Sequence, residues 1–234
     1  MSERTFDDFN EFAENYRDIH TENLKISGAD SQYFAEMKIR LLLNKETNLQ
    51  QRVLDIGCGD GITEVYFEKY FPLLKIEGID VSEESITVAK QRNLPNSNFH
   101  TYDSIHFPFE DNSFDKVFIA NVLHHIAFNK HTIIFNEIFR VLKKNGKVLI
   151  YEHNPLNPLT QYLVKTCIFD KDAKLLCHFY TLSILKKHCL FIEKLQFIIF
   201  FPRNGMLSKL IFLEKYLQWL PLGGQYFFSA IKRD

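Results

Sequence analysis

The chain has 234 residues, of which 46% are hydrophobic and 24% charged, a balance typical of a soluble globular protein with a sizeable core. Its net charge of −1 and the absence of a long Lys or Arg run argue against a nucleic-acid partner, because such partners attract strongly basic surfaces. The four widely spaced cysteines, the polar amino terminus without a signal-peptide core and the absence of a membrane-length apolar run predict a reduced, cytoplasmic protein.

Two helices are expected ahead of the main domain. Phe9, Phe12, Ala13 and Tyr16 recur at the spacing of one helix face, and residues 33–43 carry a second apolar stripe. We therefore expect residues 1–45 to form a helical cap and residues 46–234 to form the main domain.

From residue 52 onward, short apolar runs alternate with helical patterns. The expected strands are 52–56, 75–80, 98–102, 114–120 and 146–151, and the expected helices are 62–70, 83–92 and 130–142. Ser82 suits a helix N-cap, and Asn145-Gly146 suits the end of the third helix. This alternation predicts parallel strands joined by right-handed helical crossovers.

The carboxyl-terminal part adds two more strands to the predicted sheet. Residues 154–180 form a long connection, which suggests a lid over a substrate. A helix over 181–189, a strand over 191–201, a helix over 204–220 and a strand over 225–231 follow. The helix over 204–220 has few charges, so we expect it to be largely buried. The fold class is thus α/β, a doubly wound, seven-stranded, mostly parallel sheet.

A glycine-rich stretch, VLDIGCGDG, follows the first expected strand and holds glycine at positions 57, 59 and 61. Bare backbone at such a strand end lets a ligand approach closely. The dinucleotide fingerprint needs a small residue where this chain has Ile62, and Asp55 would repel a pyrophosphate. The loop therefore suits a ligand with a positively charged end better than a nicotinamide dinucleotide.

Two more acids follow the next two strands. Asp80 lies about twenty residues beyond the loop, where a carboxylate can accept hydrogen bonds from ribose hydroxyls. Asp103, assisted by Ser104, could accept from an adenine amino group. Three acids at successive strand ends predict a site for a ribonucleoside whose other end is cationic.

Four stretches carry a family resemblance: VLDIGCGDG, GIDVS, YDSIHFPFEDNSFDKVFIANVLHHI and EIFRVLKKNGKVLIYEHNP. They resemble the motifs of class I S-adenosylmethionine-dependent methyltransferases, above all the small-molecule branch with the ubiquinone-biosynthesis enzymes. The resemblance implies the Rossmann-like methyltransferase fold, S-adenosylmethionine as cofactor and S-adenosylhomocysteine as product. The cofactor-binding residues it implies are Tyr16, Asp55, Gly57, Cys58, Gly59, Gly61, Asp80, Val81, Asp103, Ser104 and Asn121.

The acceptor side offers histidines at two strand ends, where they share the crevice of the glycine loop. These are His125, preferred over its neighbour His124 because adjacent helical residues diverge by about 100°, and His153, which follows Glu152. Histidine suits a general base because its ordinary pKa is near 6.5. We expect in-line methyl transfer to a small organic acceptor, preferably to oxygen, with His125, His153 and Glu152 as catalytic candidates. No metal site is predicted.

The apolar lid and tail favour an apolar or aromatic acceptor, and they leave a membrane-surface contact open but not favoured. NVLH stands where nucleic-acid amino-methyltransferases of this fold carry an Asn/Asp/Ser-Pro-Pro-aromatic motif, which argues against nucleic acid as the substrate. Two alternatives stay open: a catalytically silent S-adenosylmethionine-binding protein that serves a partner, and a nicotinamide oxidoreductase.

Overall fold

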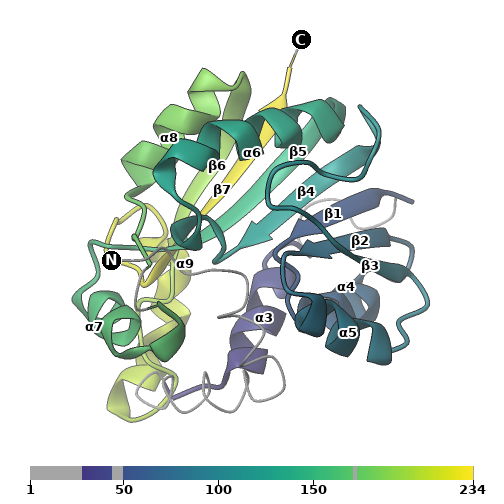
Figure 1. Ribbon diagram of the computed structural model, residues 1–234. Helices are drawn as coiled ribbons and strands as arrows, with labels where there is room; N and C mark the ends of the chain where they lie inside the picture. Colours follow the sequence, from purple (N-terminus) through teal and green to yellow (C-terminus); the bar gives the residue numbers. More distant parts are fainter. Residues whose placement is uncertain (1–27, 44–49, 171–172, 234) are drawn as a thin grey trace.

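A computed structural model describes residues 28–43, 50–170 and 173–233. One sheet lies between two layers of helices (Figure 1). Tyr16 and the first cap helix lie outside the described residues. Among those residues, no helix combines the length and the apolar character needed to cross a bilayer.

The sheet has seven strands in the order β3-β2-β1-β4-β5-β7-β6. All neighbouring strands run parallel except β7, which is antiparallel to both β5 and β6. The predicted doubly wound, mostly parallel sheet is therefore confirmed. The strands are β1 Arg52–Ile56, β2 Lys75–Asp80, β3 Ser97–Thr101, β4 Phe114–Ala120, β5 Leu142–His153, β6 Leu190–Ile198 and β7 Gln225–Lys232.

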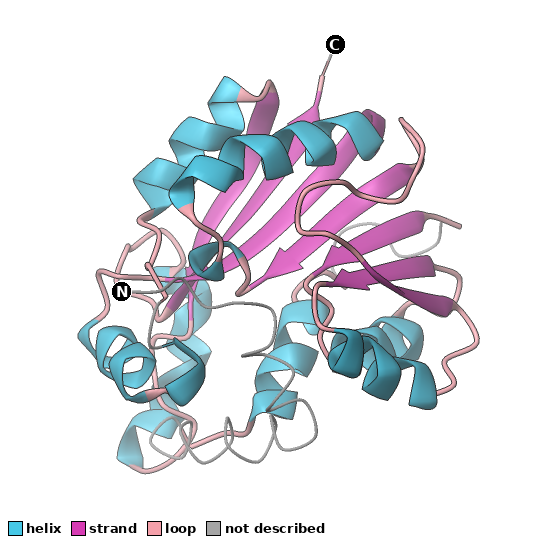
Figure 2. Ribbon diagram, in the orientation of Figure 1, coloured by secondary structure: helices cyan, strands magenta, loops and turns pink. Residues whose placement is uncertain are grey.

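Helices cover both faces of the sheet, so its central strands are buried on both sides (Figure 2). One layer holds α3 Ser31–Arg40, α4 Ile62–Tyr70 and α5 Glu83–Gln91; the other holds α6 Phe128–Val141 and α8 His178–Lys187. Alternate residues of β1 divide between the layers: Val53 packs with Phe67 of α4, whereas Leu54 packs with Ile138 of α6. The chain winds outward from β1 in one direction and from β4 in the other, so the carboxyl ends of these strands flank a crevice.

The remaining helical segments gather near the carboxyl ends of the strands (Figure 1). They are η2 Leu123–His125, α7 Pro158–Thr166, η3 Ile168–Asp170, η4 Met206–Leu213 and α9 Glu214–Leu217. The expected connection 154–180 thus contains α7 and η3. His124 and His125 lie on the short 3-10 turn η2, between β4 and α6.

The start of one strand was predicted wrongly. The helix α6 ends at Val141, and β5 begins at Leu142 instead of Gly146. Leu142 pairs with Phe114 of β4, and the pairing then shifts register before it resumes at Lys147. The turn residue Asn145, with φ +62°, lies inside this irregularity. Cross-strand pairing therefore overrode the helix-end signal of Asn145-Gly146; the other boundaries agree within three residues.

The segment 204–220 also differs from its prediction. It forms a 3-10 helix and a single α-turn, and neither contains a buried residue. Met206 is 84% exposed and Trp219 is 74% exposed. The segment is anchored through the Glu214 carboxylate, which accepts from the backbone N–H groups of Phe200 and Phe201 and pairs with Arg203. An apolar composition predicts burial only where a sheet face remains to be covered, and none of the three core clusters includes this segment.

Candidate active site

The glycine loop joins β1 to α4 with three residues in the left-handed region, at Gly57, Gly59 and Gly61. A Cβ at Gly57 would lie 2.4 Å from Cγ2 of Val122, so packing excludes any side chain there. A Cβ at Gly59 would meet no atom within 4 Å. Gly57 thus serves packing, whereas Gly59 leaves open space that a ligand can use.

Asp80, the last residue of β2, holds this loop in place. Its Oδ2 accepts from the Gly59 N–H at 2.9 Å, and its Oδ1 accepts from the Ser82 N–H at 3.0 Å. Burial raises the pKa of the Asp80 carboxyl above its ordinary value. Each carboxylate oxygen can accept more than one hydrogen bond, so the side chain can also receive ribose hydroxyls. Val81 lies half-buried beside it.

Asp55, near the end of β1, faces a second buried acid. Asp55 is 2% exposed and Glu64 of α4 is fully buried. Burial and the charge of Glu64 raise the pKa of Asp55 well above its ordinary range, and burial raises the pKa of Glu64 to about 7. No N–H or O–H donor of the described residues reaches the Glu64 oxygens. Two buried acids with raised pKa values favour sharing a proton in the cofactor-free protein.

This pair gives a pH-dependent stability. The pKa of Glu64 is raised from 4.5 to about 7 in the folded state, so the unfolded chain ionises first and the free energy of unfolding falls as pH rises between those values. At 1.36 kcal/mol per pKa unit, Glu64 by itself contributes a fall of about 3 kcal/mol. Glu64→Gln should remove most of it, measured by urea unfolding at about pH 5 and about pH 8. The exposed Glu84→Gln is the control, and an unchanged pH dependence in Glu64→Gln would contradict the shared proton.

Lys38 of α3 is a buried cation that the sequence analysis missed. It is 7% exposed, and burial lowers its pKa to about 8, although the nearby Glu152 and Asp55 carboxylates raise it. Within the described part of the chain, no side chain hydrogen-bonds its ammonium, and its backbone carbonyl accepts from the Tyr151 hydroxyl at 3.1 Å. The ammonium is thus a buried donor at the edge of the sheet that carries the glycine loop.

The predicted adenine contacts Asp103 and Ser104 differ from Asp55 and Asp80 in their surroundings. Asp103 accepts from the backbone N–H groups of Ile105 and His106 at 2.8 and 2.7 Å, and these bonds lower its pKa to about 2. Its carboxylate therefore closes its own exposed turn, where Ser104 has φ +66°. The thiol of Cys58 is buried in the cluster with Phe99, so this residue can offer only its backbone to a ligand.

Asn121 follows β4 and adopts the left-handed conformation, with φ +59°. Asparagine tolerates this conformation better than most residues. Its N–H donates to the Tyr151 carbonyl at 2.9 Å, and its Oδ1 accepts from Nε2 of Gln225 at 3.3 Å. The Oε1 of Gln225 is buried without a donor among the described residues. Gln225, at the start of β7, had no sequence signal because it reaches this edge only through antiparallel pairing with β5.

Glu152 lies inside the protein instead of lining the crevice as expected. It is fully buried, and its Oε1 accepts from the N–H groups of Val122 and Leu123 at 3.1 and 2.8 Å. Its Oε2 lies 2.6 Å from Nδ1 of His124. Burial opposes its ionisation, but the charge of His124 outweighs burial and lowers the pKa of Glu152. This carboxylate positions η2 and the His124 ring.

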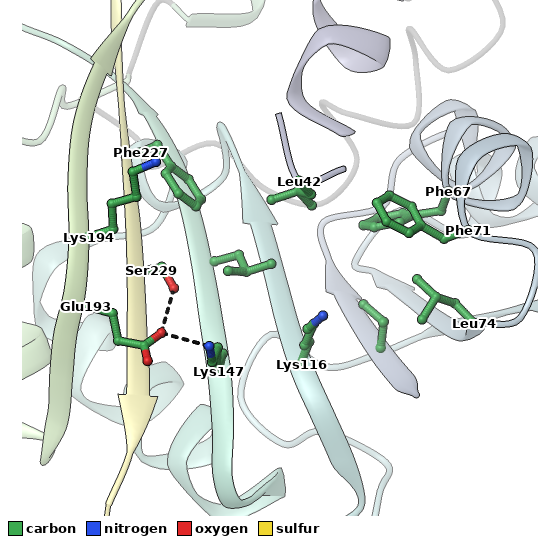
Figure 3. Close-up of a pocket in the computed structure, with 12 residues that line it drawn as sticks. Leu42, Phe67, Phe71, Leu74, Lys116, Lys147, Glu193, Lys194, Phe227 and Ser229 are labelled. Carbon is green, nitrogen blue, oxygen red and sulfur yellow. Dashed lines mark hydrogen bonds and ion pairs between the residues drawn. The ribbon is translucent and has the colours of Figure 1, made fainter. Parts of the chain in front are cut away.

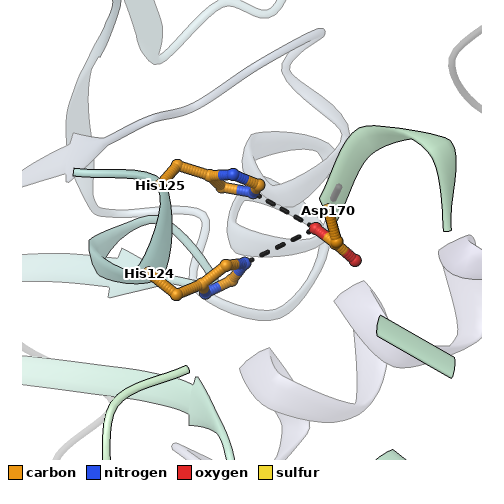
Figure 4. A group of neighbouring side chains, drawn as sticks. All are labelled: His124, His125 and Asp170. Carbon is orange, nitrogen blue, oxygen red and sulfur yellow. Dashed lines mark ion pairs between the residues drawn. The ribbon is translucent and has the colours of Figure 1, made fainter. Parts of the chain in front are cut away.

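The rings of His124 and His125 lie together with Asp170 beside it (Figure 4). The Oδ1 of Asp170 is 3.7 Å from Nε2 of His124 and 3.4 Å from Nε2 of His125. The ring centroid of His153 is 5.2 Å from that of His124. Burial opposes protonation of His124, but the carboxylates of Glu152 and Asp170 raise its pKa to about 9. Burial and the charge of His124 lower the pKa of His125 and His153 to about 3.

Asp170 was not predicted from the sequence, although it lies in the expected lid connection. The pKa of its carboxyl is lowered because the attraction of His124 and the other histidines outweighs burial. Its side chain is 12% exposed. The structure therefore brings one carboxylate of the long connection to the histidines that follow β4 and β5.

A groove lies elsewhere, between α4 and the sheet (Figure 3). It has a volume of about 330 Å³ and is lined by Phe67 and Phe71 of α4, with Leu149 and Phe227 on the sheet. None of the predicted site residues lines it. Its polar lining includes Lys116, Lys194 and Glu193; Glu193 pairs with Lys147 and accepts from Ser229. This groove therefore does not belong to the site at the glycine loop.

Comparison with known proteins decides the family. A family model described as a methyltransferase domain matches residues 54–150. An uncharacterized protein of Methanocaldococcus jannaschii is 30% identical over 201 residues, which cover 85% of this chain and 81% of that protein. The chain belongs to the S-adenosylmethionine-dependent methyltransferases.

Two further likenesses agree with this methyltransferase family. An uncharacterized methyltransferase of Bacillus subtilis is 32% identical over 130 residues, covering 53% of this chain and 50% of that protein. A solved S-adenosylmethionine-dependent methyltransferase from Archaeoglobus fulgidus has the same fold, with a TM-score of 0.68, 18% identity, and coverage of 87% of this chain and 95% of that one. The chain spans about half the length of several curated relatives.

The residues of this methyltransferase chain fit the cofactor. S-adenosylmethionine has a ribose and adenine at one end and an ammonium and a carboxylate at the other. The open space at Gly59 suits the methionine part, and the spare acceptor capacity of Asp80 suits the ribose hydroxyls. The acids Asp55 and Glu64 suit a cation, and the buried ammonium of Lys38 suits a carboxylate. When bound, the cofactor supplies an activated methyl group.

Proposed function

We propose that the protein transfers a methyl group from S-adenosylmethionine to a hydroxyl of a small organic acceptor. One observation carries this proposal: the open glycine loop and a group of three histidines follow neighbouring strands at the same edge of the sheet. A cofactor seated on the loop after β1 would thus have acceptor-side histidines beside it, after β4 and β5. The crevice at this switch point is where open α/β sheets bind ligands.

We assign the cofactor contacts by charge. Asp80 accepts from the ribose hydroxyls, and the Asp55–Glu64 pair receives the ammonium. Lys38 binds the methionine carboxylate, so the two ends of the zwitterion meet opposite buried charges. Gly57, Gly59 and Gly61 line the methionine part with bare backbone, together with the backbone of Cys58 and with Asn121. Val81, Asp103, Ser104 and Tyr16 complete the proposed set around the adenosine and the opening.

The reaction is an in-line displacement. The acceptor oxygen forms a bond to the methyl carbon as the carbon–sulfur bond breaks, and the hydroxyl proton leaves to a base. Positioning alone can contribute about 7–11 kcal/mol to such a step. The protein's main task is therefore to hold the acceptor in line and to keep water out.

His153 is the proposed base. It ends β5, is half-buried, and none of the described residues hydrogen-bonds its ring. Its pKa is low beside the charged His124, so it favours an acidic hydroxyl such as a phenol or enol over a sugar hydroxyl. His125 is the alternative base, and Glu152 acts through its hold on His124. The exposed Leu156, Leu159 and Tyr162 near α7 suit an apolar or aromatic acceptor.

Calorimetry and a transfer assay test this function. S-adenosylhomocysteine should bind with one site per chain, and radiolabelled methyl should pass to phenols and quinols faster than to sugars. NADH should give no stabilisation. Binding without transfer to any acceptor would instead support the silent cofactor-binding alternative, and the absence of cofactor binding would contradict both.

A further inference from the structure

We propose that His124, His125 and Asp170 bind a divalent metal ion of the zinc type. The His124 and His125 Nε2 atoms and the Asp170 carboxylate all lie within 4.8 Å of one another, and both rings turn toward Asp170 (Figure 4). The two nitrogen–oxygen distances are 3.4 and 3.7 Å. Two ligands of a tetrahedral zinc ion with bonds of about 2.0–2.1 Å lie about 3.3–3.4 Å apart. The spacing is thus near that of a ligand set and longer than that of a good hydrogen bond.

The surroundings of His124 strengthen this assignment. A metal-binding histidine usually donates its other ring N–H to a carboxylate, which fixes the ring and its tautomer. Here Nδ1 of His124 lies 2.6 Å from the fully buried Oε2 of Glu152. Two backbone N–H groups hold Glu152 in turn. This arrangement aims Nε2 of His124 at Asp170, with its lone pair available to an ion.

The donor types also select the ion. Two imidazoles and one carboxylate suit zinc and its neighbours in the first transition series, whereas magnesium and calcium prefer oxygen ligands. Three protein ligands leave a fourth tetrahedral position, as in catalytic zinc sites. If the proposed methyl transfer holds, an acceptor oxygen can take that position, and the ion would lower the pKa of its hydroxyl. His153 would then stay available as the base, 5.2 Å from the His124 ring between centroids.

The sequence analysis predicted no metal site because the third ligand lies 45 residues beyond His125, on a connection with no metal-binding spacing. The structure also offers a competing occupant. A proton on Nε2 would make His124 an imidazolium between the Glu152 and Asp170 carboxylates, without any metal. An experiment must therefore distinguish an ion from a proton.

The test measures metal binding by the full chain in the absence of cofactor, so its outcome is independent of methyl transfer. After treatment with a chelator, the protein is titrated with Zn²⁺ against a competing fluorescent chelator, and in parallel with Co²⁺, which absorbs visible light in tetrahedral sites. We expect one equivalent of Zn²⁺ per chain. Asp170→Asn and His125→Ala should each lower the affinity at least about 100-fold and abolish the Co²⁺ absorption.

His100→Ala is the matched control, because His100 also pairs with a carboxylate, Glu77, at 2.9 Å, but has no second histidine. It should leave Zn²⁺ affinity unchanged. Circular dichroism checks that each variant is folded. Because two ligands are substituted separately, the test remains valid if one of the two variants does not fold. The metal site is refuted if the chain takes up no stoichiometric Zn²⁺, or if Asp170→Asn and His125→Ala bind it as tightly as the parent. Either result would mean that a proton on Nε2 of His124, and not a metal ion, lies between this ring and the Asp170 carboxylate.

Discussion

Asp80→Ala should lower the affinity for S-adenosylhomocysteine at least about 100-fold. Two hydrogen bonds from ribose hydroxyls to a carboxylate contribute about 1.5–3 kcal/mol each, and the variant loses both. It also frees the Gly59 and Ser82 N–H groups that the carboxylate now holds at 2.9 and 3.0 Å. Calorimetry measures the affinity, and thermal unfolding of the ligand-free variant shows how much of the loss reflects a loosened loop.

Asp103→Ala is the comparison for this prediction. The Asp103 carboxylate is exposed and already closes its own turn with Ile105 and His106. We expect its loss to lower the affinity less than about tenfold, near the value of a single hydrogen bond. Equal effects of the two substitutions would contradict the assignment of the ribose to Asp80.

His153→Gln should lower the turnover number about 100-fold while the affinity for S-adenosylhomocysteine stays within about twofold. A positioned base contributes about 100-fold or more to a proton transfer, and the low basicity of His153 places it near the lower end of that range. Since methyl transfer itself needs positioning more than a base, residual activity should remain. Single-turnover rates at saturating cofactor, with a phenolic acceptor, measure the change.

His100→Gln is the control for a histidine outside the site, since its ring bonds Glu77 on the neighbouring strand β2. His125→Gln separates the two base candidates. If His125 were the base, its substitution would abolish turnover even where metal content is unchanged, and His153→Gln would have little effect. If His125→Gln loses turnover in proportion to its loss of bound metal, the result agrees with His153 as the base.

The sequence by itself determined the fold class and the edge of the sheet that carries the site. Apolar runs of strand length alternate with helical stripes, and this local pattern is enough to require parallel strands with covered faces. In such a sheet every residue that follows a strand lies at the same edge. Asp55, Asp80 and Asn121 could therefore be placed near one another from their positions in the chain alone.

The tertiary structure alone decided which side chains face one another. Lys38, Glu64 and Asp170 come from helices and a long connection, whose approach to the sheet depends on packing between distant segments. The same packing placed Glu152 inside the protein and left the apolar segment 204–220 exposed. Local periodicity fixes the type of an element and the end of a strand, but the burial and charge of a side chain depend on neighbours that only the folded chain supplies.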